Sequence, residues 1–278
     1  MHQDVDQEQA YALRDREAYR LARAYLLGFG EQGITDEVLQ HYLSPLPRTT
    51  PSTMAEVFRR LLESAQNKGM MATVIGRAVG GLDSLAPVLD DFDPAKVTQR
   101  FTSPDDLLDI IIRECRPVGK LRRAQGSLWP LFARATLSGA RFLCQFSSGP
   151  EFLAWVQTFD DDPRKRAALP LLLSQEIDGF GFALACDFLK ELGFLNFAKP
   201  DVHVKAIVKG LKLSSETAND YGVFKDVVRI AAHCDRTPYD VDKLFWLVGS
   251  GYFYYHRSIG RIATNRRAFI QEASSVLG

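Results

Sequence analysis

The chain has 278 residues, 46% of them hydrophobic, which is typical of a soluble globular protein with one large or two small domains. Lysine plus arginine and aspartate plus glutamate each number 34, so the zero net charge excludes a uniformly basic chain, and any nucleic-acid-binding surface must be local. The four scattered cysteines exclude a closely spaced iron–sulfur or zinc motif, and the sequence shows neither a signal peptide nor an apolar membrane-spanning run, which predicts a cytoplasmic protein.

Helical periodicity dominates from the start of the chain, and strand alternation is hardly visible, so the sequence predicts an all-α fold. Residues 1–50 are expected to form helices that pack on a core at 51–215, and residues 216–278 to form the C-terminal helices. Helix starts are marked by a hydroxyl residue with an acid three positions later, which satisfies unpaired backbone N–H groups. These starts lie at Thr53, Ser103, Ser148 and Thr237.

Positive charge is concentrated in three short clusters, each of which could simply be a solvated helix face. The last cluster includes Arg257 and Arg261, which could contribute to a local phosphate-binding surface. The other members are Lys120, Arg122 and Arg123; Arg164, Lys165 and Arg166; and Arg266 and Arg267.

A glycine turn, Gly179-Phe180-Gly181, separates two stretches of helical spacing and predicts a hairpin at residues 170–192. The backbone N–H groups that open the second helix would form a phosphate site. A plain packing corner between two helices would have the same sequence.

Asp201 follows Pro200 at the start of a predicted helix. An aspartate in this position can be an N-cap and nothing more. Asp201 is also an isolated carboxylate about twenty residues beyond the hairpin, so a catalytic role is the alternative. His203 is close by, but it has neither metal-ligand spacing nor a nucleophile beside it, and we expect it to be structural.

The aromatic stretch DVDKLFWLVGSGYFYYHR at 240–257 contains a Gly-Ser-Gly break that ends a helix. Most of its apolar residues before the break are expected in the core. Trp246, Tyr252 and Tyr254 could present flat aromatic faces to a planar ring such as a nucleic-acid base.

These features together resemble the helix-hairpin-helix DNA glycosylase superfamily, in particular its endonuclease III-like members. The resemblance rests on the hairpin, the Gly193–Asp201 loop that ends in the sequence Asp-Val-His-Val, and the stretch FRRLLESAQNKG at 58–69. It spans roughly residues 53–210, with about forty extra residues before the hairpin. The family fold implies two helical subdomains around a cleft, with residues 216–278 completing the second subdomain.

The resemblance implies a monomeric, nucleoid-associated base-excision repair enzyme that binds double-stranded DNA containing a damaged base. Gly179, Phe180 and Gly181 would hold a phosphate, and their carbonyls could share a structural monovalent cation. Gln66 would fill the gap left by the extruded base. Asp201 would stabilise the positive charge that develops on the sugar as the glycosidic bond breaks. No other cofactor and no iron–sulfur cluster are expected.

Two positions depart from the family pattern. Ala183 stands where lyase-competent members carry a lysine, which predicts a monofunctional glycosylase unless Lys68, Lys199 or Lys205 supplies the amine. Asp178 replaces the usual proline and places a negative charge beside the phosphate site. These departures keep two alternatives open, a non-catalytic helix-hairpin-helix DNA-binding protein and an all-α interaction protein.

Overall fold

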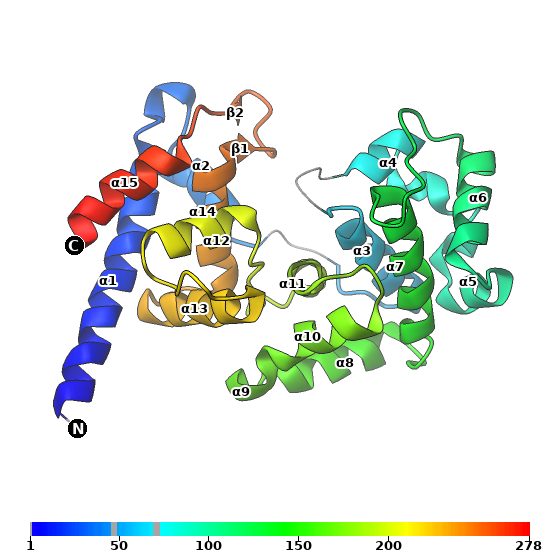
Figure 1. The fold of residues 1–278 in the computed structure, drawn as a ribbon, viewed down its shortest axis with the longest axis horizontal. Helices are drawn as coiled ribbons and strands as arrows, with labels where there is room; N and C mark the ends of the chain where they lie inside the picture. The colour runs from blue at the N-terminus through cyan, green and yellow to red at the C-terminus, as the bar shows by residue number, and fades with distance from the viewer. Residues whose placement is uncertain (1, 46–48, 69–72) are drawn as a thin grey trace. The chain divides into compact units, whose positions relative to one another are not determined.

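The structure is a computed structural model that describes the backbone of residues 2–45, 49–68 and 73–278. It is mostly helical, which confirms the all-α expectation (Figure 1). Contacts divide the chain into a terminal unit, Met1–Arg48 with Leu195–Gly278, and a central unit, Thr49–Phe194. In the described ranges, no helix combines the length and the apolar character needed to cross a membrane.

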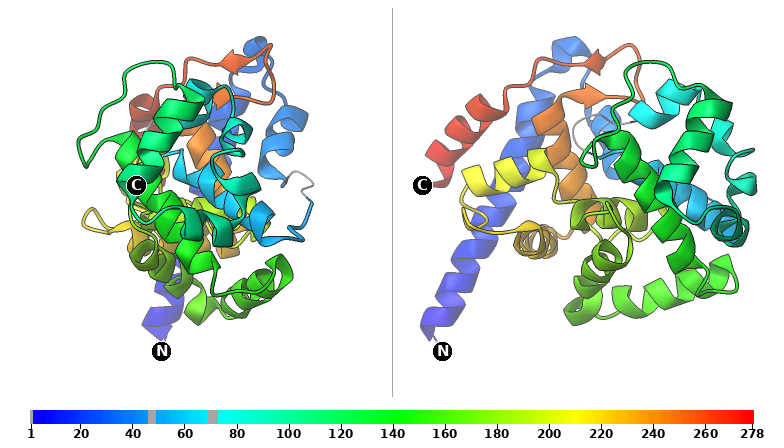
Figure 2. Two further views of the ribbon diagram at one scale, coloured as in Figure 1. Left: turned by 90° about the vertical axis from the view of Figure 1, so that its right-hand side faces the viewer. Right: turned by 45° about the vertical axis from the view of Figure 1, so that its right-hand side comes forward.

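The terminal unit brings the two ends of the chain together. Helix α1 packs against α13, α14 and α15, and Figure 1 shows α1 in blue beside α15 in red. The elements of this unit are α1 (His2–Leu27), η1 (Gly30–Gln32), α2 (Asp36–Leu43), α12 (Val202–Gly210), α13 (Asp220–His233), α14 (Pro238–Ser250), β1 (Tyr252–Phe253), β2 (Gly260–Arg261) and α15 (Arg266–Leu277). The strands pair antiparallel with Tyr252 opposite Arg261, and they are the orange arrows of Figure 2.

A buried carboxylate ties α1 to α13 in the terminal unit. Asp15 is 1% exposed, and its side chain lies 3.0 Å from Arg229 Nε and 2.7 Å from His233 Nδ1. Helix α14 supplies much of the surrounding core through Leu244 and Phe245, which are fully buried as expected from the sequence.

The central unit is built around α7, which packs against α3, α5, α6 and α10. Its elements are α3 (Met54–Ala65), α4 (Val74–Val79), η2 (Leu82–Leu85), η3 (Asp90–Phe92), α5 (Pro94–Arg100), α6 (Pro104–Cys115), α7 (Leu128–Leu143), α8 (Gly149–Asp160), α9 (Pro163–Arg166), α10 (Ala168–Glu176) and α11 (Phe182–Glu191). Helices α10 and α11 pack on each other, and α11 also packs on α3.

The four predicted helix starts are confirmed. Each hydroxyl accepts a hydrogen bond from the N–H of the acid three positions later. At Thr53 the acid side chain, Glu56, also accepts from the Thr53 N–H, which completes a capping box.

The boundary between the units differs from the expected core at 51–215. Residues 195–215 belong with the two ends of the chain, because α12 packs against α13, α14 and α15. Consequently the glycine turn lies in the central unit and Asp201 in the terminal unit.

Candidate functional site

The turn between α10 and α11 requires glycine at position 179. Gly179 has a φ of +78°, and a Cβ placed there would lie 3.0 Å from the backbone oxygen of Leu131 on α7. A larger residue at this position would be strained by the left-handed backbone conformation and by the close approach to α7.

Phe180 is buried at the turn, whereas the sequence predicted that it would contact DNA. Its side chain is 1% exposed, and its N–H donates to the Ile177 carbonyl at 3.0 Å. The ring meets that of Phe188 edge-on, with 6.2 Å between centroids. Neither its ring nor its N–H is therefore available for a phosphate.

Gly181 is the N-cap of α11 and lies in ordinary extended backbone, with φ −75° and ψ 169°. A Cβ at this position would meet no heavy atom within 4 Å, so the turn itself does not require glycine here. Gly181 presents no side chain in front of the first turn of α11, and within that turn the Leu184 N–H donates to the Gly181 carbonyl at 2.9 Å.

The negative charge of Asp178 is compensated within the central unit. Its carboxylate lies 3.0 Å from Arg134 Nε, and its backbone N–H donates to Ser138 Oγ at 2.9 Å. Lys68 approaches the same turn, and its ammonium donates to the Gly179 carbonyl at 2.8 Å. Partial burial, with a contribution from Arg134, lowers the pKa of Lys68. These side chains carry one net positive charge.

Gln66 occupies a different place from the one expected of a residue that enters a duplex. It is 6% exposed, and its side-chain oxygen accepts a hydrogen bond from the Gly76 N–H at 3.0 Å. The amide thereby joins the end of α3 to α4. Residues 69–72, which follow in the same stretch, lie outside the described residues.

Asp201 is the N-cap of α12 in the terminal unit. Its Oδ1 accepts hydrogen bonds from the N–H groups of His203 and Val204 at 2.8 and 2.9 Å. No hydrogen bond to Oδ2 is found among the described residues. The cap therefore fixes the carboxylate through one oxygen, and the structural role and a chemical role are compatible.

Burial and a second carboxylate raise the pKa of Asp201. Desolvation is the largest cause; Asp242 raises the pKa further, while Lys199 and His203 oppose the shift. Asp242 is 3% exposed, and its Oδ2 accepts from the Lys199 N–H at 2.8 Å. This bond ties α14 to the loop that carries Asp201.

His203 and Arg266 place a cation close to the start of α12. One guanidinium nitrogen of Arg266 lies 3.3 Å from His203 Nδ1 and donates to the Val202 carbonyl at 3.3 Å. Burial lowers the pKa of His203, and Arg266 and Arg261 lower it further. Helices α12 and α14 approach closely here, because a Cβ at Gly249 would lie 2.5 Å from His203 Cβ.

The predicted aromatic residues form one cluster at the C-terminal end of α14. The ring of Tyr254 lies 5.8 Å from that of Trp246 and 5.9 Å from that of Tyr252. Tyr252 is 42% exposed, and Arg261 lies over its ring at 5.1 Å. Lys243 lies over Trp246 and Tyr254 and donates to the Tyr254 hydroxyl at 2.9 Å.

The basic residues divide into paired and exposed groups. Arg164 and Lys165 pair with Asp162, and Arg166 pairs with Asp160, so this cluster is locally neutralised. Arg257 is exposed.

The lysines that could replace the missing hairpin amine lie in different units. Lys205 is paired with Asp220 at 2.7 Å in the terminal unit, which also holds Lys199. Lys68 is in the central unit with Ala183, which is partly exposed on the first turn of α11.

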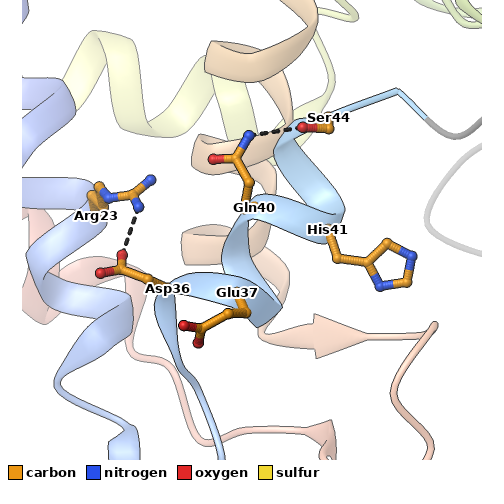
Figure 3. Close-up of a pocket in the computed structure, with 6 residues that line it drawn as sticks. All are labelled: Arg23, Asp36, Glu37, Gln40, His41 and Ser44. Atoms are coloured by element: carbon orange, nitrogen blue, oxygen red, sulfur yellow. Dashed lines mark hydrogen bonds and ion pairs between the residues drawn. The ribbon is translucent and has the colours of Figure 1, made fainter.

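An open pocket lies beside α2 in the terminal unit (Figure 3). Its lining side chains are largely engaged with one another, as Arg23 pairs with Asp36 and Gln40 donates to Ser44. Across the described ranges, no group of three or more His, Cys, Asp or Glu side chains is arranged to hold a metal ion.

The sequence pointed to Lys68 only as a candidate lyase amine and did not point to Arg134 or Asp242, because each of the three acts on a segment far from it in the chain. His203 was expected to be structural, and its close approach to Gly249 supports a packing role. The neighbouring Arg266 also places a positive charge beside it.

Comparisons with protein-family models, with curated proteins and with solved structures found no match to this chain.

Proposed function

We propose that the protein is a monofunctional DNA glycosylase, which extrudes a damaged base from duplex DNA and hydrolyses its N-glycosidic bond. The observation that carries this proposal is the hydrogen bonding of the Asp201 carboxylate. Two backbone N–H groups fix Oδ1, and Oδ2 has no hydrogen-bond partner among the described residues. A partly desolvated carboxylate interacts strongly with a neighbouring positive charge.

The reaction builds positive charge on the deoxyribose as the base departs. In the proposed mechanism, the Asp201 carboxylate stabilises this charge and orients the water that attacks the sugar. Oδ2 would perform both tasks in turn, because Oδ1 is held by the backbone. Arg266, which lies 3.3 Å from His203 Nδ1, and the exposed Arg261 would bind flanking phosphates.

The glycine turn would bind a further phosphate through the opening N–H groups of α11. Three features support this assignment: the open space in front of Gly181, the pairing of Asp178 with Arg134, and the ammonium of Lys68 at the turn. The exposed face of Tyr252 is the candidate surface for the base, with Trp246 and Tyr254 behind it.

A second candidate function is a non-catalytic protein that binds duplex DNA. Two observations favour it: the buried position of Gln66 and the alanine at position 183. It would use the same turn and arginines without base release.

Duplexes that each carry one oxidised, alkylated or deaminated base distinguish the two candidates. A monofunctional glycosylase produces abasic sites that break only after alkali treatment. Direct nicking would show a lyase amine and contradict the monofunctional assignment. Salt-sensitive binding without base release on any of the duplexes would favour the non-catalytic candidate.

A further inference from the structure

The ammonium of Lys68 is held at the glycine turn by a contact between distant parts of the chain. Lys68 follows α3, and 111 positions separate it from Gly179, whose carbonyl accepts its hydrogen bond at 2.8 Å. This bond fixes the end of a flexible side chain, so the position of the charge is determined before any ligand arrives.

The Lys68 ammonium can donate more hydrogen bonds than it makes to the described residues. A lysine ammonium has three donors, and one bond, to Gly179, is found among the described residues. Partial burial and the neighbouring Arg134 disfavour the charged form and lower the pKa of Lys68. An anion beside the ammonium would favour the charged form and oppose this shift.

Asp178, the carboxylate next to the turn, compensates the positive charge of Lys68 only in part. Asp178 opposes the lowering of the Lys68 pKa, but the desolvation and Arg134 effects exceed it. Asp178 is itself ion-paired with Arg134 at 3.0 Å. The cluster of Lys68, Arg134 and Asp178 therefore retains one positive charge, carried at the carbonyl of Gly179.

We infer that Lys68 binds a backbone phosphate of duplex DNA at the glycine turn, with one donor kept by the Gly179 carbonyl and the others given to the phosphate oxygens. This inference rests on the proposed DNA-binding function and adds to it a phosphate ligand from the segment that follows α3. The phosphate would then be bound jointly by a side chain and by backbone N–H groups.

The number of phosphate contacts can be measured from the salt dependence of binding. Each contact contributes about 0.9 to the slope of log affinity against log salt concentration for duplex DNA. The probe is a fluorescein-labelled duplex that contains one tetrahydrofuran abasic analogue, titrated by anisotropy between about 50 and 200 mM KCl. The variants are Lys68→Met, Lys68→Arg and the control Lys96→Met, which removes an exposed lysine of the same unit that is 3.8 Å from Asp93.

We expect Lys68→Met to reduce the slope by about 0.9, while Lys68→Arg and Lys96→Met retain the wild-type slope. An unchanged slope in Lys68→Met would overturn the inference, and a lowered unfolding midpoint in the same variant would then identify Lys68 as a structural tether only. If the wild-type protein does not bind the duplex at any of these salt concentrations, the proposed function itself fails, which is a different result from binding with an unchanged slope.

Discussion

At the scale of single residues, the two glycines of the turn have different physical reasons to be glycine. Gly179 is constrained by its φ of +78° and by the Leu131 carbonyl, whereas Gly181 has ordinary backbone angles and open space in front of it. Gly179 is therefore required by the fold, whereas Gly181 is available for contact with a ligand.

Alanine substitutions at Gly179 and Gly181 can therefore be compared with each other as a matched pair. Gly179→Ala should lower the free energy of unfolding by at least about 1 kcal/mol, because alanine is strained at positive φ. Gly181→Ala should change it by less than about 0.5 kcal/mol but weaken duplex binding, since its methyl group would stand in front of the α11 N–H groups. Denaturant unfolding and anisotropy measure the two effects, and unaltered binding by Gly181→Ala would argue against a phosphate there.

The pH dependence of base release also belongs to this scale. Because the pKa of Asp201 is raised, its carboxylate becomes protonated at a higher pH than an ordinary aspartate, and activity should fall as the pH drops through that raised value. Asp242→Asn removes the neighbouring charge and should lower the pKa of Asp201, which moves the loss of activity to lower pH. Single-turnover rates across the acid range measure the shift.

The exposed Asp235 provides the control for this experiment, because Asp235→Asn removes a carboxylate of the same unit and asparagine tolerates its φ of +53°. Equal profiles for Asp242→Asn and the wild type would show that Asp242 does not influence Asp201.

At the scale of elements, the sequence predicts helix starts well because capping is local. The capping box of Thr53 and Glu56 involves neighbouring residues only, and the pattern is visible in the sequence itself. The charge at the glycine turn could not be predicted in this way. Arg134 and Lys68 reach it from α7 and from the end of α3, and the burial of Gln66 depends on its contact with Gly76 on α4.

The Thr53 cap gives a direct prediction about α3. Thr53→Ala removes the acceptor for the Glu56 N–H and should destabilise the protein by about 1 kcal/mol. Thr53→Ser keeps the hydroxyl and should retain most of the stability. Chemical denaturation of the two variants measures the difference, and equal losses would show that the hydroxyl bond contributes nothing.

At the scale of the whole molecule, the division into two units was not visible in the sequence. The expected core at 51–215 followed the linear order of the family resemblance, whereas packing groups α12 with both ends of the chain. The hydrophobic pattern of a helix shows that one face is buried, but it does not identify the helix that covers it.

The Asp15 contact with Arg229 and His233 predicts that α1 is integral to the terminal unit. Asp15→Asn removes the buried carboxylate but leaves Arg229 paired with Asp226 at 2.6 Å, so it should destabilise the terminal unit by about 2 kcal/mol, as for a lost hydrogen bond to a charged group. Hydrogen exchange should show faster opening of α1 and α13, with α7 of the central unit unaffected. Uniform acceleration in both units would contradict an effect confined to the terminal unit.

The central claim is that the Asp201 carboxylate performs the chemistry, and Asp201→Asn tests it most directly. Asparagine can keep the cap through its side-chain oxygen, so the fold and duplex binding should persist. On the lesion duplex that the wild type processes, we predict that single-turnover base release falls by at least about 100-fold, as when one electrostatic stabiliser is removed from an active site. Base release at the wild-type rate, with duplex binding retained, would contradict the claim.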